Sequence, residues 1–483
     1  MSKTNNVSKK RLSTGVVGLD EVLDGGLLAG GAYLVRGCPG SGKTTLGMHF
    51  LGAGSSQGEK TLFITIAESE AQLRRNATNK GFDLTNVAFL DLSPTSDFFT
   101  EVQSYDIFSP AEVEREPITQ RIVQQVQAQQ PKRIFVDSVT QFRYLAVDEF
   151  QFHKQILSFL RFLQERDTTV LLTSEAGPEA PDEGLQFLVD GIINLEIAQT
   201  ERTLSIYKFR NSRYDQGNHS MILTDLGMKV FPRVIPDRFS REFEREVLPS
   251  AIPGLDKMLH GGIERGTVTM LSGPGGAGKT SMGIKFLTEA AMRGERSVVC
   301  CFDETPSTLV ERSRKLNMPI DEAMEAGNLV VSTFEPLDKT PDEFAHLLRE
   351  EVEQRNTKLV MLDSISGYHL CFPQEYTVEH MHRLCRYLKN MGVAVIVINE
   401  VQAISGKFQI TDMKISYLAD NVLFLRYLEV KGELRKAVGV LKKRLSDFEK
   451  TLRPMNLTSD GIKVGEPMLN LRGILKGHPE FQD

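Results

Sequence analysis

The sequence predicts an α/β protein of two tandem domains, each with a mostly parallel, twisted sheet flanked by helices. Three observations predict this class. The two halves of the 483-residue chain repeat one another, short apolar runs alternate with helical segments, and each half carries a glycine-rich octapeptide. Nearly continuous apolar runs indicate strands that are covered on both faces, as in parallel sheets.

The repeat has one dominant offset. Lys279 lies 236 positions after Lys43, and the same offset separates the Gly-Leu-Asp at 18–20 from that at 254–256. A period of this length indicates a duplicated domain rather than a solenoid repeat. Three prolines and many charged residues in 231–249 suit an exposed linker, so we expect domains at 1–240 and 241–483.

The expected elements follow the same order in each half. In the first half, a helix is expected over 44–54, and strands are expected at 31–37, 60–68, 131–138 and 168–175. Their counterparts in the second half are 266–273, 296–304, 357–364 and 392–400. In each half the octapeptide follows the first of these strands.

Both octapeptides contain the pattern Gly-x4-Gly-Lys-Thr of phosphate-binding loops. Such a loop turns its backbone N–H groups inward, where side chains would block a phosphate, and the following helix N-terminus favours negative charge. Lys43 and Lys279 are expected to bridge the β- and γ-phosphates of ATP. The candidate binding residues are Gly37, Gly40, Ser41, Gly42, Lys43, Thr44 and Thr45, and then Gly273, Gly275, Gly276, Ala277, Gly278, Lys279, Thr280 and Ser281.

Two aspartates are candidate magnesium ligands. Asp137 and Asp363 end apolar strands, and the carboxyl end of a parallel strand faces the crevice where ligands bind. The hydroxyls of Thr44 and Thr280 are expected to complete the Mg²⁺ sites. The alternative is that each aspartate caps the helix that follows its strand.

The acids that follow the second strand differ between the halves. Glu68 and Glu304 correspond at the offset of 236, whereas Ala67 stands where the second half has Asp303. Hydrolysis needs a group that orients the attacking water. We therefore expect the two sites to differ in chemistry, the alternative being neutral divergence of the halves.

Charge and cysteine content argue against several classes. A net charge of −6 and the absence of tryptophan disfavour a nucleic-acid motor, which steeply salt-dependent binding to single-stranded DNA would support. The odd count of five cysteines, with no CxxC pair, disfavours disulfides and zinc. With no apolar leader and no long apolar run, we expect a cytoplasmic protein without a membrane segment.

The combined pattern resembles the KaiC family of RecA-like ATPases, known from the cyanobacterial clock. The resemblance rests on the tandem loops, the Gly-Leu-Asp leaders, the acids after the second strand, the Asp-Ser pairs and a late Lys-x-Arg in each half. It implies two RecA-like P-loop NTPase domains and a homohexameric double ring with ATP at subunit interfaces. It also implies in-trans fingers that reach a neighbour's γ-phosphate, namely Lys208, Arg210, Lys442 and Arg444.

The resemblance further implies a serine/threonine-type autokinase in the second domain. The acceptor positions fall on Ser416 and Tyr417, with Thr411 nearby. Because a tyrosine replaces the family's threonine, Ser416 is the first expected acceptor. Asp303 and Glu304 are implied to activate the acceptor hydroxyl, and since Asp303 is shorter than the family's glutamate, we expect weaker kinase activity.

Two further differences from the family pattern concern ATP turnover and binding partners. Ala67 replaces a family glutamate, so slower ATP hydrolysis at the first ring is expected. The chain stops soon after its core, so no KaiA-dependent cycle is expected, while a KaiB-type partner on the first ring stays open. The leading interpretation is an ATP-hydrolysing, self-phosphorylating signalling switch. The alternative is a nucleotide-gated hexameric scaffold with little turnover.

Overall fold

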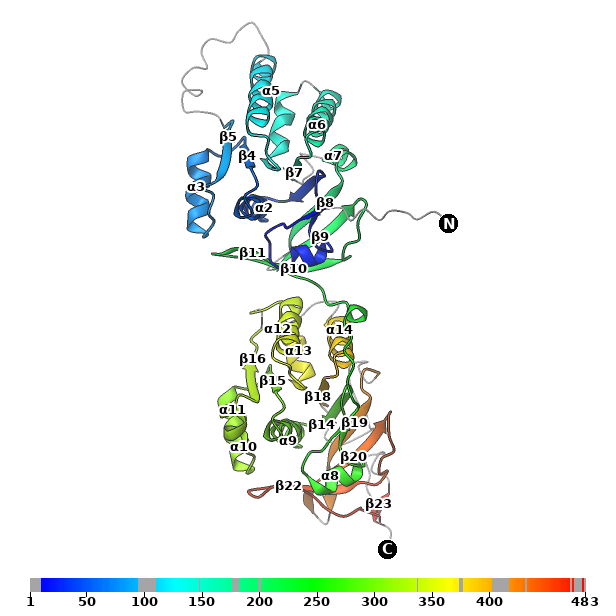
Figure 1. Cartoon of the computed structure of the whole chain (residues 1–483). Helices are drawn as coiled ribbons and strands as arrows, with labels where there is room; N and C mark the ends of the chain where they lie inside the picture. Colours follow the sequence, from blue (N-terminus) through cyan, green and yellow to red (C-terminus); the bar gives the residue numbers. More distant parts are fainter. Residues whose placement is uncertain are drawn as a thin grey trace, which may run out of the picture. The chain divides into compact units, whose positions relative to one another are not determined.

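The computed structural model describes residues 10–93, 110–146, 148–175, 182–198, 201–336, 338–372, 377–401, 417–430, 432–469, 471–472 and 480–481. The chain forms two compact units, Met1–Arg233 and Val234–Asp483 (Figure 1). None of the helices in the described ranges combines the length and apolar character that a bilayer span requires.

The first unit is built on a nine-stranded sheet in the order β11-β10-β9-β8-β3-β7-β6-β4-β5. The parallel strands are β3 (Ala32–Gly37), β4 (Thr61–Thr65), β5 (Val87–Asp91), β6 (Arg133–Asp137), β7 (Thr169–Glu175) and β8 (Gly191–Ala198). An antiparallel extension adds β9 (Glu201–Phe209), β10 (Asn218–Thr224) and β11 (Gly227–Phe231). A separate two-stranded sheet pairs β1 (Arg11–Leu12) with β2 (Leu27–Leu28).

Helices cover both faces of this sheet. Those named in the first unit are α1 (Leu19–Val22), α2 (Lys43–Ser56), α3 (Glu70–Asn79), α5 (Pro110–Gln129), the 3-10 helix η1 (Val139–Leu145), α6 (Glu149–Gln164) and α7 (Glu183–Leu188). One buried cluster joins α2 and α3 to the sheet and includes Phe50, Phe63 and Leu73. The other joins α5 and α6 to the opposite face and includes Val126 and Ile156.

The second unit repeats this plan with the sheet order β16-β15-β17-β18-β14-β19-β20-β21-β22. Its parallel strands are β14 (Val268–Gly273), β15 (Ser297–Cys301), β16 (Leu329–Thr333), β17 (Leu359–Asp363), β18 (Ala394–Glu400) and β19 (Asn421–Val430). The antiparallel strands are β20 (Glu433–Lys443), β21 (Arg453–Thr458) and β22 (Gly461–Val464). Short pairs are β12 (Val247–Leu248) with β13 (Ile263–Glu264), and β23 (Leu471–Arg472) with β24 (Glu480–Phe481).

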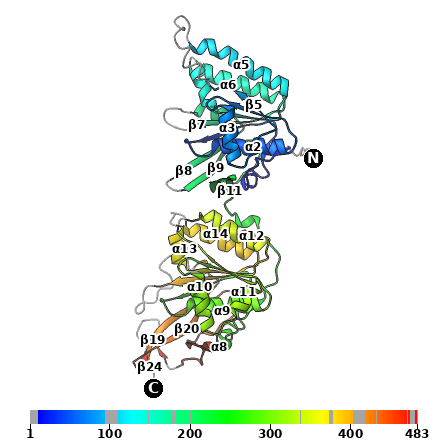
Figure 2. The same ribbon diagram turned by 90° about the vertical axis from the view of Figure 1, so that its left-hand side faces the viewer.

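Figure 2 shows the three layers of the second unit, with the sheet between two groups of helices. One group is α12 (Pro341–Glu353), α13 (Ile365–Cys371) and α14 (Thr377–Asn390), and the other is α9 (Lys279–Met292), α10 (Pro306–Lys315) and α11 (Ile320–Glu325). The short helix α8 (Pro253–Met258) precedes β13. Two buried clusters again fill the space above and below the sheet.

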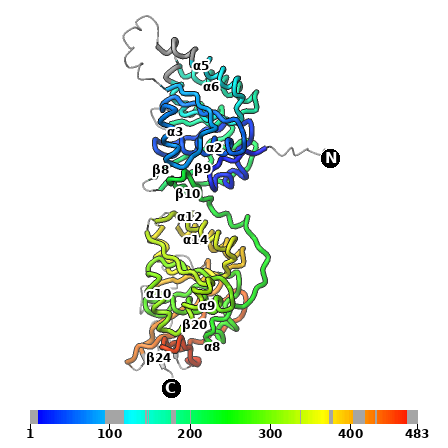
Figure 3. The backbone as a smooth tube through the Cα atoms, turned by 60° about the vertical axis from the view of Figure 1, so that its left-hand side comes forward, coloured from blue at the N-terminus to red at the C-terminus, as the bar shows by residue number. Residues whose placement is uncertain are grey.

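The charged segment before β12 packs along the second unit instead of lying free (Figure 3). It contains the short 3-10 helix η2 (Pro236–Arg238). Asn390 Nδ2 donates to the carbonyl oxygen of Pro236 at 2.9 Å, and the ring of Phe239 lies against that of Tyr387. Val234 is buried, whereas most charged side chains of the segment are exposed. Composition therefore indicates exposure, but the interspersed apolar residues attach the segment to its unit.

The predicted fold class is confirmed. Each expected strand overlaps a parallel strand of the sheet, and the first strand of each half occupies a central position between two parallel neighbours. All six residues of β14 are buried, including the polar Thr269 and Ser272. The carboxyl ends of these strands lie at one edge of the sheet, where ligands bind in open α/β folds.

Candidate nucleotide sites

The first glycine-rich loop joins the end of β3 to the start of α2. Gly42 is the N-cap of α2 with a φ of 105°, a left-handed conformation that favours glycine, and as a glycine it has no side chain with which to cap the helix. The N–H groups of the first helical turn therefore stay available to an anion. Gly278 occupies the same place before α9, with a φ of 103° and again no side-chain cap.

Gly37 is required for a different reason, which is space. A Cβ atom there would lie 2.5 Å from Ser41 Oγ and 2.6 Å from the carbonyl oxygen of Leu195. Ser41 Oγ is itself buried and has no hydrogen-bond partner among the described residues. An unsatisfied buried hydroxyl inside the loop is consistent with a partner that a ligand supplies.

The two loop lysines are folded back against their own loops. Lys43 Nζ donates to the carbonyl oxygens of Gly37 at 2.7 Å and Cys38 at 3.0 Å, and Lys279 Nζ donates to that of Pro274 at 2.8 Å. Burial lowers the pKa of both lysines, and nearby carboxylates oppose this shift. A phosphate would offer each ammonium a stronger, charged acceptor than these carbonyl groups.

Each loop threonine meets the aspartate at the end of a neighbouring strand. Thr44 Oγ1 donates to Asp137 Oδ2 at 2.6 Å, and the other carboxylate oxygen accepts from Thr173 at 2.5 Å. In the second unit Thr280 is hydrogen-bonded to Asp363, whose pKa burial raises to about 6. A hydroxyl and a carboxylate held together beside a phosphate loop are oxygen donors that suit Mg²⁺. The donor set therefore fits a magnesium–nucleotide complex.

One small cleft lies beside each phosphate loop. The first, of about 250 Å³, is lined by Lys43, Thr44 and Glu68, among others. Burial raises the pKa of Glu68, and the charge of Asp137 adds to the shift. The second cleft, of about 280 Å³, contains Lys279, Thr280, Asp303, Glu304 and Asp363. The structure thus brings the expected carboxylates to the phosphate loops in both units.

The second cleft contains a cation that the motifs did not indicate. Arg312 on α10 binds Glu304 with both guanidinium ends, at 3.0 and 2.8 Å. The equivalent position in the first unit, 236 residues earlier, is Asn76. An alignment of α3 with α10, outside the motifs, would have revealed this difference from the sequence.

In each unit, a basic residue on an antiparallel strand donates a hydrogen bond to the phosphate loop of the same unit. Arg202 on β9 donates to the carbonyl oxygen of Gly40 at 2.7 Å, and Lys436 on β20 donates to that of Gly276 at 2.8 Å. The two side chains lie 234 positions apart, which is also the separation of Lys208 and Lys442. Sequence reasoning missed both because no motif includes them.

The proposed finger residues lie at the opposite edge of each sheet. Lys208 pairs with Ile192 at the amino end of β8, and Lys442 pairs with Val422 at the amino end of β19. Lys208 Nζ donates to the carbonyl oxygens of Gln186 and Val189, both at 2.7 Å. The phosphate loops follow the carboxyl ends of β3 and β14. These lysines, with Arg210 and Arg444 two residues further on, therefore face away from their own loops.

The expected phosphate acceptors are described only in part. Ser416 and Thr411 lie outside the described residues. Tyr417 is 53% exposed, and its ring lies 5.7 Å from that of His382. It stands shortly before β19, at the sheet edge that also holds Lys442.

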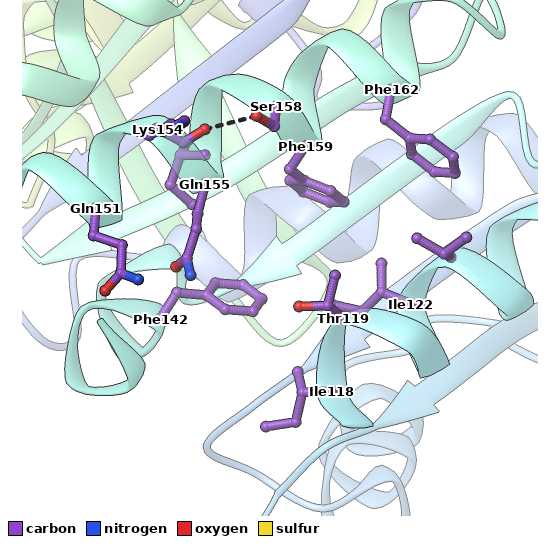
Figure 4. Close-up of a pocket in the computed structure, with 12 residues that line it drawn as sticks. Ile118, Thr119, Ile122, Phe142, Gln151, Lys154, Gln155, Ser158, Phe159 and Phe162 are labelled. Carbon is purple, nitrogen blue, oxygen red and sulfur yellow. Dashed lines mark hydrogen bonds between the residues drawn. The ribbon is translucent and has the colours of Figure 1, made fainter. Parts of the chain in front are cut away.

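A larger cavity in the first unit lies away from the loop. It has a volume of about 470 Å³ between α5, η1 and α6. Figure 4 shows Phe142, Phe159 and Phe162 at this cavity, with Ser158 hydrogen-bonded to the carbonyl oxygen of Lys154. The described residues that line it are mostly apolar and include no carboxylate, so phosphate chemistry belongs to the smaller clefts.

Comparison with known proteins agrees with this architecture. A family model described as "ATPase: KaiC" matches residues 12–235 and 248–468. The circadian clock oscillator protein KaiC of Parasynechococcus marenigrum (strain WH8102) is 26% identical over 495 residues, covering 99% of this chain and 94% of that protein. The circadian clock protein KaiC3 of Synechocystis sp. (strain ATCC 27184 / PCC 6803 / Kazusa) is 26% identical over 488 residues, covering 98% and 95%. With both units matched and both phosphate loops in place, the chain belongs to the KaiC family of ATPases.

Proposed function

We propose that this protein binds Mg-ATP at both loops, hydrolyses ATP, and phosphorylates itself in the second unit at Ser416, with Tyr417 as a further acceptor. The observation that carries the proposal is the repeated arrangement of an uncapped helix N-terminus, a buried lysine and a threonine–aspartate pair. These are the parts that phosphoryl transfer uses.

Each residue has a physical role in this scheme. Lys43 and Lys279 leave their loop carbonyl groups and bind the phosphate oxygens of ATP. The threonine hydroxyl and the aspartate would hold Mg²⁺, which would supply positive charge beside the phosphates. Glu68 orients and deprotonates water at the first site, and its raised pKa suits a proton acceptor. Asp303 and Glu304 are the candidate proton acceptors at the second site.

The position of the finger residues supports assembly of several chains. Lys208 and Lys442 lie at the sheet edge opposite their own loops, so they reach a phosphate only if it belongs to another subunit. A cyclic arrangement places this edge of one subunit against the loop of the next. We therefore propose a homohexameric double ring with ATP between subunits and cations acting in trans.

Phosphosite mapping tests the autokinase. The purified chain is incubated with Mg-ATP, and modified residues are located by mass spectrometry. We expect phosphate on Ser416, its loss in Lys279→Ala, and its retention in the matched first-site variant Lys43→Ala, because only the second loop serves the acceptor. Undiminished Ser416 phosphate in Lys279→Ala would show that another kinase places it.

A second candidate function is a nucleotide-gated scaffold. It is favoured by Ala67, which leaves the first cleft with fewer carboxylates than the second. Under this alternative, ATP holds the ring together without turnover. Light scattering would then detect ATP-dependent hexamers while phosphate release stays at background.

A further inference from the structure

The first cleft contains a lysine that no motif includes. Lys80 is the C-cap of α3 and lines this cleft together with Thr45 and the loop residues. Its Nζ lies 3.5 Å from Thr45 Oγ1, and among the described residues its side chain has no ion-pair partner. A cation at the wall of a cleft that is not paired with a carboxylate can bind an anionic ligand.

The second unit has no cation at the equivalent position. At the offset of 236, Leu316 stands where the first unit has Lys80, and it packs against the buried core of its unit. Besides its loop lysine, the second cleft contains Arg312, which lies one turn earlier on α10. Both carboxylate oxygens of Glu304 accept hydrogen bonds from Arg312. The charge of Arg312 is therefore balanced by a carboxylate within the cleft, whereas that of Lys80 is available to a ligand.

The position of Lys80 indicates which part of a nucleotide it would contact. Thr44 donates to Asp137 at the candidate magnesium site, and in phosphate loops the metal and the loop lysine take the β- and γ-phosphates. Thr45 is the next residue of α2, so its side chain points about 100° around the helix from that of Thr44. Lys80 meets this second hydroxyl, on a side of the helix that is turned away from the candidate metal site.

We propose that Lys80 binds the α-phosphate of a nucleoside di- or triphosphate in the first site and raises the affinity of that site for ATP and ADP alike. This inference rests on the proposed function, namely that Mg-ATP binds at the first loop. ATP and ADP both carry an α-phosphate, so the lysine does not distinguish them. The first site consequently retains its ADP product longer than it would with a leucine at this position. The second site, which has Leu316, lacks this contribution.

Equilibrium binding of ADP and of a non-hydrolysable ATP analogue, each with Mg²⁺, tests the assignment. The full chain carries Lys279→Ala to silence the second loop. We expect Lys80→Leu, which copies the residue of the second unit, to weaken the binding of both nucleotides about 10-fold. Lys80→Arg, which retains the charge, should stay within about 3-fold of the parent Lys279→Ala chain. At about 1 M salt the effect of Lys80→Leu should shrink, because salt screens the interaction.

The matched control is Arg75→Leu on the same helix, which also removes one positive charge, at an exposed residue that does not line the cleft. It should leave both affinities unchanged, and a loss equal to that of Lys80→Leu would overturn the inference, because net charge rather than position would then decide. Equal binding by Lys80→Leu and the parent chain would also overturn it. So would a loss confined to the ATP analogue, since the γ-phosphate is the group that ADP lacks. If the parent chain binds neither nucleotide, the proposed function fails at the first loop and the inference fails with it.

Discussion

At the scale of single residues, the two sites differ by a few side chains on the same backbone plan. Ala67 is exposed two residues after the end of β4 and next to Glu68, while the equivalent Asp303 is hydrogen-bonded to Ser364. The second cleft also holds a guanidinium where the first holds an amide. These changes alter charge and proton acceptance without changing the loops that bind phosphate. The proposed division of labour between the sites would therefore reside in the carboxylates and their partners.

The first prediction concerns Ala67. Ala67→Glu should raise hydrolysis at the first site about 10-fold, because a second carboxylate can help orient the attacking water. Phosphate release is measured in a Lys279→Ala background, which removes the second site. Ala71→Glu, at an exposed alanine on the next helix, is the control and should have no effect. An unchanged rate in Ala67→Glu would contradict the proposed role of this position.

The second prediction concerns Asp363 and pH. Burial raises the pKa of Asp363 from its ordinary 3.8 to about 6, so ionisation costs more in the folded chain than in the unfolded chain. Removing the charge with Asp363→Asn should stabilise the magnesium-free second unit at pH 8 by about 1–3 kcal/mol. The gain should shrink as pH falls from about 6 to about 4, since the folded carboxyl is then already protonated.

Calorimetry with a chelator present measures this difference between the two chains. The same variant should lose the stabilisation that Mg-ATP gives to the second unit, because the metal requires the ionised carboxylate. A destabilised Asp363→Asn unit at pH 8 would show that the ionised aspartate is better satisfied than its burial indicates.

At the scale of elements, local signals and long-range pairings were predictable to different extents. The strand, loop and helix around Lys43 were predicted from sequence because glycine spacing and apolar runs are local properties. Arg312 was not predicted because no motif includes it, although its partner Glu304 lies only eight residues earlier in the chain. The contact of Arg202 with Gly40 was missed for another reason, since it joins residues far apart in sequence. Segment 231–249 was expected to be exposed because it is rich in charge and proline. A few apolar side chains among the charged ones nevertheless attach it to the second unit.

The third prediction concerns the tight turn between β3 and α2. Gly37→Ala should destabilise the first unit by about 1–3 kcal/mol and abolish its nucleotide binding, because the new Cβ would collide with Ser41 and Leu195. Gly58→Ala is the control, since a Cβ there meets nothing within 4 Å although φ is 75°. It should cost about 1 kcal/mol through backbone strain and leave nucleotide binding intact. Equilibrium binding of a fluorescent ATP analogue in a Lys279→Ala background separates these outcomes.

At the scale of the whole molecule, the proposal depends on one subunit completing the site of another. Lys442 Nζ is held by the carbonyl oxygen of Ala419, and Arg444 lies 3.4 Å from Asp420. Both cations are thereby fixed at the edge of the sheet where β19 begins, whereas the phosphate loop of the same unit follows the opposite, carboxyl end of β14. Burial and the neighbouring cations Arg444 and Lys389 lower the pKa of Lys442, and Asp420 opposes this shift. A phosphate from an adjacent chain would further stabilise the charged ammonium.

The fourth prediction uses mixed assemblies. Lys279→Ala chains lack a working loop and Lys442→Ala chains lack the cation, so each should show little self-phosphorylation alone. Mixing them in equal amounts should restore activity at about a quarter of the interfaces, those where an intact loop meets an intact lysine of its neighbour. Labelling from γ-labelled ATP, after exchange of subunits is verified by light scattering, measures this recovery. Two variants in the same loop, Lys279→Ala and Thr280→Ala, should not rescue one another, because no interface in their mixture contains an intact loop. If Lys442 instead acted on the ATP of its own chain, every chain in the first mixture would carry a defective site, and mixing would restore nothing.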